Sequence, residues 1–260
     1  MTETAHTVRG YAGLVSLAVQ SLGFIPEESL VMVCLTDSAR LGPIGRIDLP
    51  EDASTRRWHQ WVRTPTAGCA PGIAVLGFAC DEGVRRNHGR IGAAEGPMAL
   101  RKMLSNLPVM GDAPLYDAGT VACTDGDLEA AQARYAEAMA SLLDAGHLAV
   151  GLGGGHEIAY ASYLGLAQHL RARRPRLAIV NIDAHFDLRR QAQGSSGTPF
   201  LQAIDDARER GLPLDYLAYG ISAAANTRVL FDTADALGVH YVRDDELGLL
   251  ELPRRLAELK

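Results

Sequence analysis

The sequence predicts an α/β protein with three layers, in which helices cover both faces of a mostly parallel β-sheet. Three apolar runs without polar alternation indicate strands that are buried on both faces, at residues 72–79, 147–152 and 177–182. Helical stretches lie between them, and the clearest is residues 127–143, which is rich in Ala, Glu and Leu. Alternation of strands and helices is typical of a layered α/β sheet.

The remaining elements of this part of the chain follow in the same order. Asp127 is the expected N-cap of the first long helix, and residues 158–173 form a second helix that Pro175 ends. Beyond it we expect, in order, a strand, a helix and a strand at residues 214–220, 226–237 and 239–243. In such sheets, ligands bind beyond the carboxyl ends of the strands.

The first part of the chain has a different character. An apolar stretch at residues 14–20 precedes two expected strands, at residues 29–35 and 44–49, which would pair with each other. Residues 51–70 have the composition of a connector. We therefore expect an N-terminal module, a linker and a larger α/β domain, at residues 1–53, 54–71 and 72–260.

Composition places the chain among cytoplasmic globular proteins. It has 260 residues, 47% of them hydrophobic and 22% charged, with a formal net charge of −6. That charge gives no reason to expect nucleic acid as a partner, and no apolar run approaches the roughly 20 residues that span a membrane. The four cysteines lack C-x-x-C spacing, which indicates neither a disulfide framework nor a zinc ribbon.

One short segment, Asp-Ala-His-Phe-Asp at residues 183–187, predicts a metal site. In an extended segment, Asp183, His185 and Asp187 project to the same side, and His156 follows the preceding expected strand in a glycine-rich loop. Carboxylates and imidazoles suit Mn(II) or a similar divalent ion better than a thiolate-bound zinc. The alternative is a polar strand end with ordinary caps. Because unpaired buried charge is costly, the metal site is the favoured interpretation.

Motifs along residues 57–260 carry a family resemblance. They are residues 57–60, 77–84, 87–97, 115–119, 153–157, 181–189, 195–200, 219–222 and 225–227. Together and in this order, they resemble the ureohydrolase superfamily of arginases and agmatinases. The variants Phe-Asp-Leu-Arg at residues 186–189 and Ser-Ser-Gly-Thr-Pro at residues 195–199 favour the formimidoylglutamases within it.

The resemblance implies an arginase-like fold, a small-molecule amidine substrate and assembly into a homo-oligomer. The implied reaction is hydrolysis of N-formimidoyl-L-glutamate to L-glutamate and formamide in histidine degradation, with a water activated by a pair of Mn(II) ions. The implied metal ligands are His156, Asp183, His185 and Asp187. The alternatives are a guanidino substrate such as agmatine, or a non-catalytic remnant or binding subunit on the same scaffold.

Four further residues are candidates for contact with the substrate. Arg189 can bind a carboxylate bidentately, although a surface salt bridge is an equal alternative. Ser196 stands where agmatinase-like relatives carry a His, and a hydroxyl cannot replace an imidazole as a proton shuttle. Asn87 and Arg90 lie in a loop that would line the pocket, with a turn-forming role as the alternative. We expect Glu157 to cap a helix or to support His156.

Two parts of the chain depart from the family pattern. The family has a later strand ending in Asp-x-Asp, which we do not find; residues 244–246 fit an earlier strand-to-helix junction, with Asp245 as N-cap. We therefore expect a C-terminally truncated domain with an open hydrophobic sheet edge, one weakly held metal ion and little or no activity. Residues 10–50 resemble an unrelated, uncharacterised bacterial domain.

Overall fold

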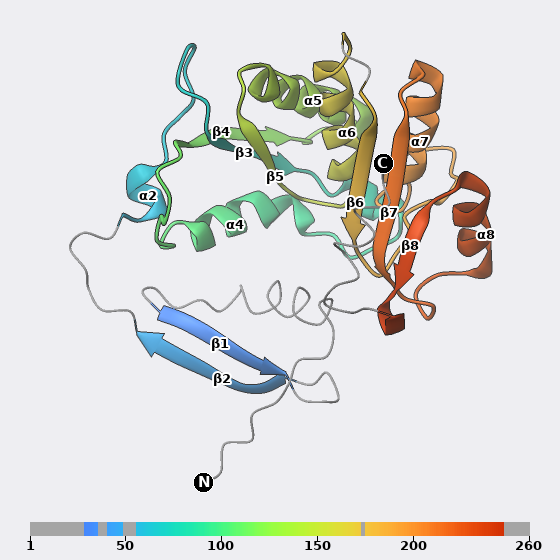
Figure 1. Ribbon diagram of the computed structural model, residues 1–260, viewed down its shortest axis with the longest axis horizontal. Helices are drawn as coiled ribbons and strands as arrows, with labels where there is room; N and C mark the ends of the chain where they lie inside the picture. Colours follow the sequence, from blue (N-terminus) through green and yellow to red (C-terminus); the bar gives the residue numbers. More distant parts are fainter. Residues whose placement is uncertain (1–28, 36–40, 49–55, 173–174, 247–260) are drawn as a thin grey trace.

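The computed structural model describes residues 29–35, 41–48, 56–172 and 175–246 (Figure 1). In its α/β part, the described strands form two sheets of three, and every strand pairing there is parallel. The first sheet has the order β4–β3–β5, with β3 at Ile73–Ala79, β4 at Leu115–Ala122 and β5 at Leu148–Leu152. The second has the order β6–β7–β8, with β6 at Leu177–Ile182, β7 at Leu214–Ile221 and β8 at His240–Arg243.

The helices of this part lie on both sides of the strands. The helices are α2 (Trp58–Trp61), α3 (Glu82–Arg86), α4 (Gly96–Leu104), α5 (Leu128–Asp144), α6 (Ile158–His169), α7 (Pro199–Arg210) and α8 (Arg228–Leu237). Figure 1 shows α5, α6 and α7 along one side of the strands and α4 on the other side of the first sheet. This arrangement, with its parallel pairings, confirms the predicted layered α/β class.

Most of the predicted elements are present, with shifted ends. The side chain of Asp127 accepts a hydrogen bond from the backbone N–H of Ala130 at 2.9 Å, which confirms it as the N-cap of α5. Helix α6 ends at His169 rather than at residue 173. Asp245 lies within the short 3-10 helix Asp244–Glu246 and forms an ion pair with Arg243, and the helix that it is predicted to cap lies outside the described residues. Strand β4 and helices α4 and α7 were not predicted.

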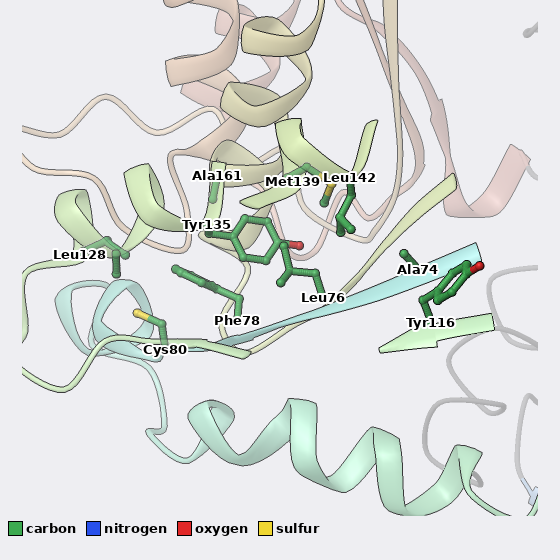
Figure 2. Close-up of a cluster of buried hydrophobic side chains, with 11 residues drawn as sticks. Ala74, Leu76, Phe78, Cys80, Tyr116, Leu128, Tyr135, Met139, Leu142 and Ala161 are labelled. Carbon is green, nitrogen blue, oxygen red and sulfur yellow. The ribbon is translucent and has the colours of Figure 1, made fainter. Parts of the chain in front are cut away.

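The core of the first half lies between β3 and the helices α5 and α6. Figure 2 shows this cluster, in which Phe78 of β3 and Tyr135 of α5 are fully buried. Their rings meet edge to face with centroids 5.2 Å apart, which is a favoured geometry for aromatic pairs. Burial of β3 on both faces therefore matches the prediction from its apolar run.

Strands β5 and β6, in contrast, are much more exposed than their apolar sequences predict. Leu148 and Val150 of β5 are 64% and 38% exposed, and Val180 and Ile182 of β6 are 39% and 45% exposed. The prediction that both strands are fully buried is wrong. The reason is positional: β3 pairs with a strand on each side, whereas β5 and β6 each end a sheet within the described part of the chain.

The N-terminal strands form an antiparallel pair, β1 (Ser29–Leu35) with β2 (Leu41–Asp48), as predicted. The apolar stretch at residues 14–20 lies outside the described residues. Part of the expected linker bonds to the α/β part: the backbone N–H of Trp58 donates to Leu107 O at 3.0 Å, and that of Arg63 donates to Leu115 O at 3.0 Å. None of the described helices has the length and apolar content needed to cross a membrane.

Candidate metal centre

Three ligand-type side chains converge where β5 and β6 end. Nδ1 of His156 lies 2.7 Å from Oδ2 of Asp187 and 3.4 Å from Oδ2 of Asp183. One donor atom from each residue lies within 4.8 Å of the other two. A single ion could therefore contact all three side chains. The set offers one nitrogen and two carboxylates, which fits a divalent ion such as Mn2+.

The loop that carries His156 is fixed by close backbone approach. The backbone N–H of Gly154 donates to Phe78 O at 3.0 Å, and that of Gly155 donates to Cys80 O at 2.8 Å. A Cβ atom on Gly154 would collide with the carbonyl oxygen of Cys80. Glycine is therefore required for this loop to lie against the end of β3, and its position there brings His156 to the carboxyl ends of the strands.

The segment from Asp183 to Asp187 reaches the site by a different geometry from the predicted one. It is not extended: β6 ends at Ile182, a bend follows, and Asp187 has a left-handed φ of 50°. The prediction that alternate side chains of a continuing strand point together is therefore wrong. Asp187 turns back toward His156 because of its left-handed backbone, a conformation that Asp and Asn adopt more readily than most residues.

His185 lies beside this group rather than within it. Its Nδ1 is 3.1 Å from Oδ1 of Asp183, the carboxylate oxygen that faces away from His156, and its side chain is about half exposed. The backbone N–H of His185 donates to the same Asp183 oxygen at 2.9 Å. The structure thus brings together three of the four predicted ligands, with the fourth in contact with one of them.

Asn226 holds the Asp183–Asp187 loop in place, a role that the sequence analysis did not assign. Its Nδ2 donates to Ala184 O at 2.7 Å, and its Oδ1 accepts from the backbone N–H of Phe186 at 3.1 Å. The Phe186 ring is fully buried against Phe231 and Tyr241. The signal for Asn226 was present in the 225–227 motif, but its partners lie about forty residues away in sequence.

The electrostatics of the group favour a positive charge between the carboxylates. Burial of the His156 ring opposes protonation, but the hydrogen bond to Asp187 and the charge of Asp183 outweigh it, so the pKa of His156 is raised. A metal ion bound here would take over that charge, and His156 would bind it in the neutral form.

Glu157 ties the glycine-rich loop to another part of the site. It is fully buried, and its Oε1 accepts a hydrogen bond from the backbone N–H of Gly83 at 2.8 Å. Glu157 is the N-cap residue of α6, one of its two predicted roles, although its side chain makes no capping hydrogen bond there. Burial raises its pKa above the ordinary value for a glutamate.

The candidate substrate residues form a hydrogen-bonded chain beside the centre. Nη1 of Arg189 donates to Asn87 Oδ1 at 2.7 Å, and Nδ2 of Asn87 donates to Ser196 Oγ at 3.1 Å. The backbone N–H of Ser196 donates to Gly83 O at 3.0 Å, and Gly83 also contacts Glu157. Arg90 is exposed and joins none of the hydrogen bonds or ion pairs found among the described residues.

Comparison with known proteins places this chain in a family. Residues 71–260 match the Arginase family, and the chain belongs to it. Formimidoylglutamases are among the relatives that it matches. That of Ralstonia nicotianae is 52% identical over 217 residues, covering 82% of this chain and 67% of the relative. That of Chromobacterium violaceum is 50% identical over 219 residues, covering 82% of this chain and 70% of the relative.

Solved structures agree on the fold. Formimidoylglutamase from Bacillus subtilis superposes with a TM-score of 0.68 at 21% identity, covering 80% of this chain and 66% of that one. Formiminoglutamase from Trypanosoma cruzi, determined with Mn2+, gives 0.65 at 22% identity, covering 79% and 70%. The resemblance recognised from the motifs is confirmed. The chain spans about two thirds of the length of these relatives.

Proposed function

We propose that this chain carries the site of a metal-dependent amidine hydrolase that acts on N-formimidoyl-L-glutamate. In this reaction the oxygen of water bonds to the amidine carbon, and the bond from that carbon to the glutamate nitrogen breaks, which yields formamide and L-glutamate. The observation that carries the proposal is the convergence of His156, Asp183 and Asp187 at the ends of β5 and β6. The formimidoylglutamase relatives favour this substrate over a guanidino compound.

In this proposal, His156, Asp183 and Asp187 hold the ion, and His185 adds a fourth donor once its ring turns away from Asp183. When bound, Mn2+ lowers the pKa of water and so supplies a nucleophile at neutral pH. A pair of Mn2+ ions with octahedral preference needs many more ligands than four side chains supply. We therefore expect one weakly held ion and low turnover from this chain alone.

Arg189 is the proposed binding group for a substrate carboxylate. A guanidinium has five N–H donors, and Asn87 occupies one of the Arg189 donors, which leaves others for a bidentate contact. Ser196 fixes Asn87 and thereby the orientation of Arg189. Arg90 would add a second positive charge to the same loop region.

The test compares products from the full chain with Mn2+ added, using N-formimidoyl-L-glutamate and agmatine in parallel. We expect formamide to be released faster than urea. Arg189→Gln should raise KM at least tenfold with a smaller effect on kcat, because it removes a contact to the non-reacting part of the substrate. Arg190→Gln is the matched control, since Arg190 is exposed and, among the described residues, pairs with Asp205 alone.

Each other outcome has a clear meaning. Faster release of urea would contradict the proposed substrate. An unchanged KM in Arg189→Gln would show that Arg189 does not bind the substrate. Absence of turnover at saturating Mn2+ would favour the alternative of a non-catalytic member of the family.

We also propose that the β1–β2 hairpin belongs to an N-terminal module separate from the α/β domain. The two strands pair with each other, whereas residues 56–63 bond to the α/β part, which supports a module that ends at residue 53. Limited proteolysis should cut within residues 49–55 first and leave the α/β domain intact. First cuts inside the α/β domain would contradict this division.

A further inference from the structure

The short helix α3 and its C-cap contact one loop of the candidate site at three points. Gly83, Arg86 and Asn87 are three and four positions apart, so they lie on one side of the helix. The backbone N–H of Ser196 donates to Gly83 O at 3.0 Å, and Nδ2 of Asn87 donates to Ser196 Oγ at 3.1 Å. Arg86 makes the third contact, in which its Nη1 donates to Gly194 O at 3.1 Å. The loop is therefore held against α3 at neighbouring positions.

The other partners of Arg86 fix the orientation of its guanidinium. Its Nε donates to Glu82 Oε1 at 3.0 Å, and Nη1 and Nη2 donate to the two carboxylate oxygens of Glu129 at 2.6 and 3.0 Å. Glu129 lies in the first turn of α5, where the helix dipole favours a carboxylate. The Arg86 side chain is only 13% exposed. A planar guanidinium bound on two sides presents its remaining N–H groups in a defined direction, here toward Gly194.

The neighbouring Arg85 lacks this contact with the loop. Its side chain also pairs with Glu82, through hydrogen bonds from Nε at 2.6 Å and from Nη2 at 2.5 Å. It is 66% exposed and has no other ion-pair partner among the described residues. Two arginines thus share one carboxylate, and only Arg86 connects α3 to α5 and to Gly194.

The same loop contacts Arg189, the proposed binding group for a substrate carboxylate. The backbone N–H of Arg189 donates to Gly197 O at 3.0 Å. A Cβ atom on Gly197 would lie 3.1 Å from Cδ of Arg189, so the glycine leaves room for the arginine side chain to lie close to the loop. The guanidinium then reaches Asn87, which is itself bonded to Ser196. The loop therefore sets both the backbone and the side chain of Arg189.

Hydrogen bonds within the loop connect its two contact regions. The backbone N–H of Ser195, a buried residue, donates to Thr198 Oγ1 at 2.9 Å, and the backbone N–H of Gly197 donates to Ser195 Oγ at 3.2 Å. A shift of Gly194 away from Arg86 would therefore displace Gly197 as well.

We propose that Arg86 is a positioning residue for substrate binding. It holds residues 194–198 against α3 and, through this loop, keeps Arg189 in the orientation that binds a carboxylate. The inference rests on the proposed function, because the loop affects the substrate only if Arg189 binds it. Since Arg86 acts through the loop and does not contact the ligands of the metal ion, its loss should weaken substrate binding and leave the chemical step intact.

The first measurement follows the loop in the full chain without metal or substrate. Arg86→Gln should speed amide hydrogen exchange at Ser196 and Gly197 by about tenfold, because the loop loses a contact with α3. Arg85→Gln is the matched control, since it removes a neighbouring charge and leaves the loop contact in place. Unchanged exchange in Arg86→Gln, or equal acceleration in both variants, would overturn the proposal whatever the activity of the chain.

The second measurement is the hydrolysis of N-formimidoyl-L-glutamate with Mn2+ added. Arg86→Gln should raise KM by about fivefold and change kcat by less than about twofold, as expected for the loss of a hydrogen bond that only positions the substrate site. Arg86→Lys keeps the charge but cannot form the bidentate contact with Glu129, so its KM should lie between the two. Arg85→Gln should match the unaltered chain. A fall in kcat at unchanged KM would overturn the proposal.

Binding of the product L-glutamate separates this inference from the proposed function. Absence of turnover in the unaltered chain would count against the proposed activity, and titration calorimetry with L-glutamate would then replace the kinetic measurement. We expect Arg86→Gln to bind L-glutamate about fivefold more weakly than the unaltered chain and Arg85→Gln do. Equal affinities, or no binding by the unaltered chain, would overturn the role of Arg86 in positioning Arg189.

Discussion

Strands β5 and β6 are polar at their carboxyl ends, where the candidate site lies, but expose apolar side chains along their lengths. At their ends, polar loops meet and bring His156 within 2.7 Å of Asp187. Along their lengths, apolar residues such as Val150 and Val180 remain more than a third exposed. The site is assembled by loops held by local hydrogen bonds, whereas burial of a strand requires a neighbour on each side. A chain can therefore form its metal-binding loops while the sheet behind them stays open.

The largest expected effect comes from matched valine substitutions on a central and an edge strand. Val75 of β3 is 2% exposed and Val180 of β6 is 39% exposed. Val75→Thr should lower the free energy of unfolding by about 1–3 kcal/mol, because it buries a hydroxyl without a partner. Val180→Thr should cost about 0.5 kcal/mol or less, because its hydroxyl can reach water. Urea denaturation measures both.

The same two variants also test whether β3 and β6 differ in burial. Equal losses in the isolated chain would mean that β6 is covered as completely as β3.

An effect of similar size is expected at the residue that holds the Asp183–Asp187 loop. Asn226→Ala removes the acceptor for the backbone N–H of Phe186, and a buried donor left without a partner costs about 1–3 kcal/mol. Outer partners of metal ligands typically change metal affinity by about 10–100-fold, so Mn2+ binding should weaken by roughly tenfold or more. Asn226→Asp separates the two contacts, since it keeps the oxygen that accepts from Phe186 but loses the amide that donates to Ala184 O. Unchanged Mn2+ affinity in Asn226→Ala would show that the loop holds its shape without this residue.

The smallest effect is expected at an ion-pair network away from the exposed edges. Arg85 and Arg86 lower the pKa of Glu82 to about 2. Because the folded-state pKa is depressed, the stabilisation is complete above the ordinary value of 4.5 and is lost as pH falls from there toward about 2. Glu82→Gln should cost about 1 kcal/mol at pH 7 and flatten this part of the pH profile. A pH profile identical to that of the unaltered chain would show that the Glu82 ion pairs do not contribute to stability.

Much of the fold could be predicted from the sequence, because the central strands are apolar runs and Asp127 marks a helix start. Strand β4 was not predicted, because Asp117 interrupts its apolar sequence. In the fold, Arg101 of α4 neutralises this carboxylate through contacts of 2.6 and 2.8 Å. Helix α7 begins at Pro199, a residue that suits the first turn of a helix but also suits a loop. Such cases depend on partners that are distant in sequence.

The candidate site, like the fold, could be predicted only in part. Residue types and motifs pointed to His156, Asp183 and Asp187, and the structure brings these three together. The left-handed backbone of Asp187 and the support from Asn226 could not be predicted, because each depends on how the loop folds back. The exposure of β5 and β6 could not be predicted either, because an apolar run indicates burial but does not show whether a neighbouring strand is present to provide it.

The central claim is that the loops after β5 and β6 form a divalent-cation site, and Mn2+ titration monitored by electron paramagnetic resonance tests it most directly. Asp187→Asn is the sharpest variant, because asparagine also adopts the left-handed backbone of this position and only the charge is lost. We expect the unaltered chain to reduce the signal of free Mn2+ and Asp187→Asn to bind Mn2+ at least tenfold more weakly. The free energy of unfolding should be the same for both proteins within about 1 kcal/mol. Equal loss of the free Mn2+ signal with both proteins would contradict the claim.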